Sequence, residues 1–182
     1  DQAWYDNNDI TLFSGEKVIA INRSNKTIVS DNDRIIPYDS LWIATGSDPF
    51  IIPVPGKDLD GIVTFRDIKD VNAMIETSKT YKNAVVIGGG LLGLEAAYGL
   101  KRNGMNVTVI HLADTLMERQ LDEAAGYLLK SDLESRGITI LTEANTKELI
   151  GDGRVQAVKL SDGAEIPADL VVMADGIRPN IA

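Results

Sequence analysis

The sequence predicts an α/β fold built around a central parallel sheet, and three observations support this prediction. In the middle of the chain, short contiguous apolar runs alternate with longer segments whose residues favour a helix. A turn rich in glycine lies where one of these apolar runs meets one of these helical segments. On both sides of this alternating part, short β-branched runs are separated by turn residues, which is typical of antiparallel strands.

The alternating part predicts a strand–helix–strand–helix–strand unit. In chain order its elements are residues 83–87, 91–103, 106–111, 121–136 and 138–141. The contiguous apolar residues 85–87 fit a strand that is covered on both faces, as in a parallel sheet. Gly104 and Gly137 directly follow the two helical segments and are expected to end them. Two consecutive strand–helix–strand units favour parallel strands.

Further elements complete this part of the chain. A short helix is expected over residues 67–78, and a last buried strand over 169–174. Between residues 146 and 160 we expect two strands around the turn 151–153, followed by a hairpin turn at 162–163. The second long helix carries an apolar stripe that we expect to pack on the sheet, formed by Leu121, Ala124, Ala125, Leu128, Leu129 and Leu133.

The first part of the chain reads as short strands joined by turns, followed by a connecting loop. The expected strands are residues 10–13, 18–21, 27–30, 34–38 and 41–44. The loop contains four turn-forming residues, Pro49, Pro53, Pro55 and Gly56. Such a composition is typical of a connection between domains. We therefore expect a partial, strand-rich domain with a linker over residues 1–61, and a second domain over residues 62–182.

The charge and the cysteine content exclude several classes of protein. The chain has 182 residues, of which 18 are basic and 27 acidic, so its net charge is −9. This charge disfavours nucleic acid or an anionic membrane surface as a partner, because both attract a basic face. The chain has no cysteine, which excludes disulfides, thiolate metal sites and redox-active dithiols from it.

Other features exclude a self-contained catalytic centre and a membrane span. With a single histidine, a hydrolytic triad is not expected, and no metal-ligand spacing appears, so we expect neither catalytic residues nor a metal site in this chain. No apolar run reaches the roughly 18 residues of a membrane-spanning helix. The missing cysteines fit a reducing cytoplasm, where we expect the protein. The chain starts at Asp1 and not at Met, so we expect its start to be a cut within a longer protein.

The strongest local signal is the glycine-rich turn at residues 88–93, between an expected strand and an expected helix. Gly88 permits a tight turn, and Gly90 lets the backbone approach a pyrophosphate without a Cβ in the way. Gly93, helped by the small Ala97, lets the helix pack closely on the strand. The amides and the dipole at the start of the helix stabilise phosphate charge. The predicted dinucleotide contacts are Gly88, Gly89, Gly90, Leu91, Leu92 and Gly93.

This turn and its flanking elements predict a three-layer Rossmann-type domain that binds NAD(P)H, with a central parallel sheet and an antiparallel β-meander. The alternative is a glycine-rich turn needed only for packing. Three consecutive glycines disfavour that alternative, because they cost chain entropy on folding.

The residue at the end of the second strand usually decides how the adenosine ribose is recognised. A carboxylate there accepts hydrogen bonds from the ribose and repels a 2′-phosphate. This chain has His111 instead, whose neutral ring accepts one hydrogen bond and whose charged form tolerates phosphate. The choice between NADH and NADPH therefore stays open, as does a purely structural role for His111. Asp114 can replace the missing carboxylate and Arg119 can assist a phosphate, although surface charges are commonly without such roles.

Two motifs at the borders of the second domain carry a family resemblance. Residues 38–47, Tyr-Asp-Ser-Leu-Trp-Ile-Ala-Thr-Gly-Ser, resemble the strand and Ala-Thr-Gly element of flavoprotein reductases that bind two dinucleotides. Residues 170–180 resemble the element where the chain of those reductases returns from the NAD(P) domain. The resemblance implies that Ala44, Thr45 and Gly46 lie on the FAD side and that Gly176 contacts NAD(P).

The run from Gly88 to Asp122 narrows the resemblance further. With Leu-Leu-Gly-Leu-Glu-Ala-Ala at 91–97 and Leu-Met-Glu-Arg-Gln-Leu-Asp at 116–122, it resembles the large subunits of assimilatory NAD(P)H nitrite reductases. This implies hydride transfer from NAD(P)H to FAD, and then electron transfer through an iron–sulfur centre to sirohaem, where nitrite becomes ammonia. Glu95 matches the family glutamate beside the nicotinamide and flavin rings, with a helix-surface carboxylate as the alternative. Asp175 departs from the family, which commonly has a small or apolar residue there.

The resemblance also implies which partners this chain has. FAD, the iron–sulfur cluster and sirohaem are expected to be held by parts of the protein outside this chain. The expected partners are NAD(P)H and the remaining FAD and redox domains of the same polypeptide, with a homodimer as a possibility, and neither nucleic acid nor a membrane. Two alternatives stay open: a reductase for rubredoxin or ferredoxin, and a nucleotide-sensing module without turnover.

Overall fold

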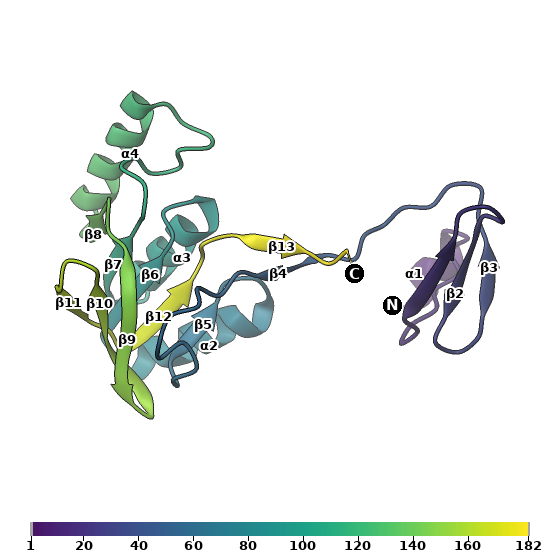
Figure 1. Cartoon of the computed structure of the whole chain (residues 1–182), viewed down its shortest axis with the longest axis horizontal. Coiled ribbons are helices and arrows are strands. Elements are labelled where there is room, and N and C mark those ends of the chain that lie inside the picture. The colour runs from purple at the N-terminus through teal and green to yellow at the C-terminus, as the bar shows by residue number, and fades with distance from the viewer. Residues whose placement is uncertain (1, 182) are drawn as a thin grey trace. The chain divides into compact units, whose positions relative to one another are not determined.

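The computed structural model describes residues 2–181 and divides the chain into two compact units (Figure 1). The first unit ends at Ala44, and the second begins at Thr45. Between residues 2 and 181, no helix combines the length and the apolar character that a membrane crossing requires.

The first unit contains one short helix and one antiparallel sheet. Helix α1 (Gln2–Asn7) is followed by strands β1 (Val18–Asn22), β2 (Thr27–Ser30) and β3 (Ile35–Pro37). The strands lie in the order β1-β2-β3, so each pairs with its neighbour in sequence. Three of the five strands expected in this region are therefore confirmed, while α1 was not expected.

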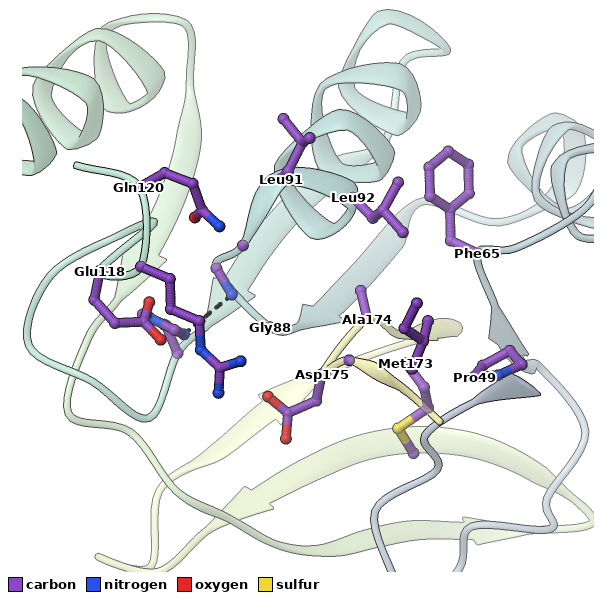
Figure 2. Close-up of a pocket in the computed structure, with 16 residues that line it drawn as sticks. Pro49, Phe65, Gly88, Leu91, Leu92, Glu118, Gln120, Met173, Ala174 and Asp175 are labelled. Carbon is purple, nitrogen blue, oxygen red and sulfur yellow. Dashed lines mark hydrogen bonds and ion pairs between the residues drawn. The ribbon is translucent and has the colours of Figure 1, made fainter. Parts of the chain in front are cut away.

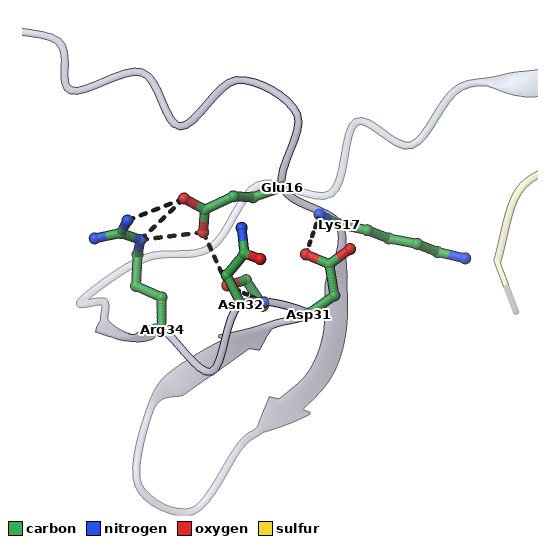
Figure 3. A network of polar contacts seen from close by, with 6 residues as sticks. Glu16, Lys17, Asp31, Asn32 and Arg34 are labelled. Carbon is green, nitrogen blue, oxygen red and sulfur yellow. Dashed lines mark hydrogen bonds and ion pairs between the residues drawn. The ribbon is translucent and has the colours of Figure 1, made fainter.

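The segment before β1 is fixed to the turn between β2 and β3 by polar contacts (Figure 3). The guanidinium of Arg34 donates to both carboxylate oxygens of Glu16 over 3.0–3.2 Å, and the hydroxyl of Ser30 donates to the same carboxylate over 2.9 Å. These contacts hold the pKa of Glu16 below its usual range, chiefly through the hydrogen bond from Arg34. The backbone N–H of Lys17 donates to Asp31 over 3.0 Å. The unit is thus closed by side chains as well as by strand pairing.

The strands expected at residues 10–13 and 41–44 are wrong. Both runs are apolar, but neither forms a strand, and Trp42 in the second run is 91% exposed. An extended segment becomes a strand when its backbone groups bond to a neighbouring strand. Among residues 2–181, no strand pairs with either run. Apolar composition alone was therefore a misleading signal.

The second unit is built on a five-stranded parallel sheet in the order β5-β12-β6-β7-β8. The strands are β5 (Ile62–Thr64), β6 (Asn83–Ile87), β7 (Asn106–Ile110), β8 (Ile138–Leu141) and β12 (Leu170–Met173). Val86 lies at the centre of the sheet, opposite Val172 on one side and Val109 on the other. β12 therefore inserts between the first two strands of this sheet, although it is the last of the five in sequence.

Both faces of this sheet are covered, and successive residues of one strand enter different cores. In β6, Ala84 and Val86 belong to the core under the helices, whereas Val85 and Ile87 belong to the core under the antiparallel strands. This double burial explains why the strand is a contiguous apolar run and shows no alternation. The sheet is thus the middle of three layers.

Three helices form the first outer layer. They are α2 (Ile68–Thr80), α3 (Leu91–Arg102) and α4 (Glu123–Ser135). Asp67 caps α2 by accepting from two backbone amides over 2.7 and 3.1 Å, and Asp122 caps α4 by accepting from the amide of Ala125 over 2.8 Å. α3 begins at Gly90 instead, and no side chain caps it. The amide end of α3 is therefore the one helix start in this layer that no side chain satisfies.

An antiparallel meander forms the other outer layer. Its strands are β9 (Thr146–Asp152), β10 (Arg154–Leu160) and β11 (Glu165–Pro167), in the order β11-β10-β9. The guanidinium of Arg154 lies 4.0 Å from the ring centroid of Tyr81 and donates to the backbone oxygen of Asp169 over 2.8 Å. This side chain joins the meander to the ends of the parallel strands. The predicted α/β class, with a parallel sheet, a meander and further antiparallel strands, is confirmed.

The apolar stripe expected on the second long helix is only partly correct. Leu133 is buried, but Leu128 is 67% exposed. Gly126 is buried instead, and a Cβ placed there would lie 2.2 Å from the Cγ2 atom of Thr115. The helix therefore approaches the loop before it through a glycine, which turns Leu128 away from the core.

Two short strands outside the main sheets join distant parts of the second unit. β4 (Ser47–Pro49) pairs with β13 (Ile177–Pro179) in an antiparallel ribbon. Pro49 was expected to lie in the connecting loop, so this short strand was not expected. The ribbon brings the Ala-Thr-Gly motif next to the motif at residues 170–180. Two motifs far apart in sequence thus meet where the chain enters and leaves this unit.

Matched leucine substitutions test where the core lies. Leu100 is 2% exposed in the core under the helices. We expect Leu100→Ala to lower the free energy of unfolding by about 2–5 kcal/mol, because it removes buried methyl groups and leaves a cavity. The control Leu128→Ala makes the same chemical change at an exposed position, and should stay within about 0.5 kcal/mol of the parent. Urea unfolding followed by circular dichroism measures both, and equal losses would contradict the assigned core.

Candidate functional site

A cavity of about 260 Å³ opens at the carboxyl ends of the parallel strands (Figure 2). Its walls include the turn after β6, the start of α3, the residue after β7 and the segment after β12. In open α/β sheets, ligands bind outside the carboxyl ends of the strands. The cavity therefore lies where the fold favours a ligand.

Three glycines of the turn are required by close approaches within the protein. Gly88 has a φ of 116°, and a Cβ there would lie 2.4 Å from the backbone oxygen of Ala174. A Cβ on Gly89 would lie 2.7 Å from the Cγ atom of His111. A Cβ on Gly93 would lie 2.0 Å from the oxygen of Gly88, so the helix contacts the turn directly. These positions agree with the tight turn and close helix packing expected from the sequence.

Gly90 differs from its three neighbours, because a Cβ at this position would meet no atom within 4 Å. Its φ of −84° and ψ of −178° are accessible to any residue. Nothing inside the protein therefore requires a glycine here. The space beside Gly90 belongs to the cavity, next to the uncapped amide end of α3. This combination of free space and unsatisfied amides suits an anion such as a phosphate.

His111 is buried and uses both ring nitrogens inside the protein. Its Nδ1 accepts from the backbone N–H of Gly89 over 3.1 Å. Its Nε2 lies 3.1 Å from the backbone oxygen of Thr115 and 3.1 Å from the Oε2 atom of Glu118. Since both of these groups are acceptors, Nε2 carries the proton and the neutral ring satisfies all three contacts. The ring so placed ties the glycine turn to the loop after β7.

Charged side chains meet at one end of the cavity. Glu118, Arg119 and Asp175 all line it. Burial raises the pKa of the Asp175 carboxyl, the nearby charge of Glu118 acts in the same direction, and the charge of Arg119 acts in the opposite direction. Asp114, the other carboxylate considered from the sequence, does not line the cavity.

Glu95 lies away from this cavity. It is exposed on α3 and lines a second hollow of about 180 Å³ between α2 and α3, together with Phe65 and Met74. Phe65 lines both hollows, so the two are adjacent. The role expected for Glu95 beside the nicotinamide and flavin rings stays a prediction.

Of the motif residues expected on the FAD side, Ala44 belongs to the first unit, and Thr45 and Gly46 belong to the second. Ala44 is the last residue of the first unit. The hydroxyl of Thr45 donates to the backbone oxygen of Asn180, and the backbone oxygen of Gly46 accepts from the N–H of Asn180 over 3.0 Å. Gly176 lines the cavity with a φ of 113°. Thr45 and Gly46 are thus bonded to the returning motif that contains Gly176.

The sequence analysis assigned no role to Glu118 or Gln120, which also line the cavity. Both lie in the motif at residues 116–122, so the resemblance included them without distinguishing them. Their relation to His111 depends on the path of the loop after β7, which no local pattern reveals. In the described part of the chain, no group of three or more histidine, cysteine or acidic side chains is arranged to hold a metal ion.

Known proteins resemble this chain over almost all of its length. Nitrite reductase [NAD(P)H] of Bacillus subtilis is 58% identical over 180 residues, which are 99% of this chain and 22% of that protein. The resemblance to nitrite reductases is therefore confirmed, while the chain spans about a fifth of that relative's length. The likeness concerns this segment only.

Solved structures share the fold. A ferredoxin reductase from Rhodopseudomonas palustris has a TM-score of 0.90 and 28% identity, with 100% of this chain and 45% of that chain covered. A water-forming NADH oxidase from Lactobacillus brevis, solved with NADH, has a TM-score of 0.77 and 25% identity over 91% of this chain and 38% of that chain. An engineered form of that oxidase with five substitutions was solved with NADPH.

A family model also matches the sequence directly. The model is described as pyridine nucleotide-disulphide oxidoreductase, and it covers residues 4–182, which include most of the first unit, the second unit and the whole cavity. Because this match extends over nearly the entire chain and agrees with the fold, the chain belongs to the pyridine nucleotide-disulphide oxidoreductase family.

Proposed function

We propose that this chain is the NAD(P)H-binding segment of a FAD-dependent oxidoreductase, and that it helps to pass a hydride from NAD(P)H to FAD. Residues 62–182 form the NAD(P) domain in this proposal, and residues 1–61 are part of the FAD domain with its linker. The observation that carries the proposal is the uncapped amide end of α3, which faces a cavity beside Gly90.

The cavity fits a dinucleotide diphosphate in three respects. The space beside Gly90 lets a phosphate approach the backbone without meeting a Cβ. The first amides of α3 have no partner within the helix, and its dipole favours negative charge. Leu91, Leu92 and Gly176 also line the cavity, so it is not confined to the glycine turn. The amide of Gly89 is already bonded to His111, which leaves the phosphate contacts to Gly90 and the start of α3.

The residues of this chain bind and orient the nucleotide. The nicotinamide, when bound, supplies the hydride, and the flavin accepts it. The apolar side chains of Leu91, Leu92 and Met173 line the cavity and exclude water beside the nucleotide. Thr45 and Gly46, bonded to Asn180, form the crossing toward the FAD side in this proposal.

Nitrite is the terminal acceptor that the comparisons favour. The 58% identity to a nitrite reductase is the observation behind this choice, and nitrite would be reduced to ammonia. The chain has no cysteine to supply a thiolate, so an iron–sulfur cluster and sirohaem would be held by other parts of a longer polypeptide. The FAD and redox domains of that polypeptide are then its partners, and we expect a cytoplasmic location and a possible homodimer.

A ferredoxin-type acceptor is the second candidate. The ferredoxin reductase from Rhodopseudomonas palustris shares the fold over the whole chain, which favours this possibility. A nucleotide-sensing module without turnover is disfavoured, because the ribbon of β4 and β13 joins the two motifs that resemble those of flavoprotein reductases.

Two glycine substitutions separate binding from folding. We expect Gly90→Ala to leave the thermal midpoint almost unchanged, because its Cβ meets no protein atom. The same Cβ obstructs the diphosphate, so the affinity for NADH should fall about tenfold or more. Gly93→Val is the contrasting variant and should lower the free energy of unfolding by about 2 kcal/mol through its clash with Gly88. Calorimetric titration and thermal melts measure both effects; unchanged affinity in folded Gly90→Ala would argue against the site.

Rapid mixing tests the proposed electron path in the longer flavoprotein that carries this segment. Under anaerobic conditions, we expect NADH or NADPH to bleach the absorbance of the oxidised flavin, because hydride transfer reduces it. Nitrite added afterwards should restore the absorbance, whereas restoration by oxidised ferredoxin alone would favour the second candidate. A flavin that stays oxidised with both nucleotides would overturn the proposed function.

A further inference from the structure

The position that usually recognises the adenosine ribose is used for another purpose in this chain. His111 follows the last residue of β7, where a carboxylate is common in dinucleotide-binding domains. Both of its ring nitrogens are hydrogen-bonded within the protein, to Gly89 on one side and to Thr115 and Glu118 on the other. The residue is 7% exposed. A ribose hydroxyl therefore finds no unused polar atom on His111.

Glu118 offers the carboxylate that His111 lacks. Its Oε2 atom accepts from the Nε2 of His111 over 3.1 Å, which fixes the orientation of the group. Its Oε1 atom has no hydrogen-bond partner among residues 2–181, and the side chain is 42% exposed and lines the cavity. A buried histidine thus holds one oxygen of Glu118 and leaves the other for a ligand.

A second carboxylate reaches the same cavity from a different element. Asp175 follows β12, whereas Glu118 lies in the loop after β7. Figure 2 shows both side chains near the glycine turn. Burial is the main cause that raises the pKa of Asp175, and the charge of Glu118 raises it further, so the two carboxylates are close enough to interact. With the ring of His111 neutral, Arg119 is the single cationic side chain among the residues that line the cavity. The charged side chains around the cavity therefore sum to a negative charge.

We propose that Glu118, oriented by His111, accepts the hydroxyls of the adenosine ribose, and that Glu118 and Asp175 together select NADH over NADPH. The inference rests on the proposed function and deepens it. A carboxylate accepts hydrogen bonds from a 2′-hydroxyl and repels a 2′-phosphate. His111 is a positioning residue in this arrangement, since it acts on the nucleotide through Glu118. The NADH oxidase solved with NADH and its engineered form solved with NADPH differ by five substitutions, so the fold accommodates either nucleotide with few side-chain changes.

The test uses the 182-residue chain and titrates it with NAD⁺ and NADP⁺ by calorimetry. Glu118→Gln and Asp175→Asn each remove one negative charge and keep the size of the side chain. We expect the parent chain to prefer NAD⁺, and each substitution to reduce the ratio of the two affinities, by about tenfold for Glu118→Gln. Asp114→Asn is the matched control: it removes a carboxylate from the same loop but outside the cavity, and should change the ratio by less than about twofold.

A double-mutant cycle tests the positioning role of His111. If His111 acts through Glu118, then Glu118→Gln should change the ratio of affinities much less in a His111→Gln background than in the parent chain. A merely structural role for His111 would leave the two effects additive. Thermal melts of every variant show whether each still folds.

The outcomes separate this inference from the function on which it rests. A folded parent chain that binds neither nucleotide at millimolar concentration would overturn the proposed function and the inference with it. A parent chain that binds, but prefers NADP⁺ or responds to Glu118→Gln and Asp175→Asn no more than to Asp114→Asn, would overturn the inference alone.

Discussion

The direct contact between the start of α3 and the turn before it is the constraint on which the site depends. Gly93 lies so close to Gly88 that a Cβ would overlap the backbone oxygen of Gly88. Gly88 in turn lies against Ala174, at the end of the strand inserted beside β6. The two close approaches bring three backbone segments together at one edge of the sheet. The amide end of α3 can face a cavity there only because no side chain separates these segments.

Helices α2, α3 and α4 pack on the same face of the parallel sheet, but their N-termini differ. α2 and α4 begin at aspartates that accept from their first amides, which stabilises a helix end by about 1 kcal/mol. α3 begins at Gly90 and forgoes that stabilisation. Core contacts offset the loss, because Leu94, Ala96, Ala97 and Leu100 of α3 are all buried. A helix that is held by packing along its length can leave its amide end to a ligand.

Much of this architecture could be predicted, because the responsible signals are local. Residues 85–87 form a contiguous apolar run since they alternate between two cores, and the glycines at 88, 90 and 93 have distinct geometric roles. The errors arise where partners decide the outcome. Trp42 lies in an apolar run, but among residues 2–181 no strand pairs with it. Leu128 fits a helical stripe, but the close approach of Gly126 to Thr115 turns it outward.

In the site, too, the features set by local sequence were predictable, and those set by contacts with distant residues were not. The sequence predicted the glycine turn and the cavity-lining Gly176, but it did not reveal that His111 faces inward. That orientation results from three contacts, to Gly89, Thr115 and Glu118, which meet only when the loop after β7 folds back over the turn. The expectation that the residue after β7 recognises the ribose depends only on residue type and position, so it takes no account of the path of this loop. Two proteins with the same backbone fold can therefore use different positions for the polar side chain that contacts a ligand.

The charges around the cavity bear on which groups can attract a phosphate. The chain carries a net charge of −9, and two carboxylates but one arginine line the cavity, so a dianionic ligand gains little from the side chains. Attraction must then come from oriented backbone amides, whose partial charges act at short range. The proposed diphosphate contacts lie at the start of α3, and the proposed ribose contact lies at Glu118. A site built in this way binds phosphate where amides converge and disfavours further phosphate elsewhere, because an added 2′-phosphate would face carboxylates and no second helix start.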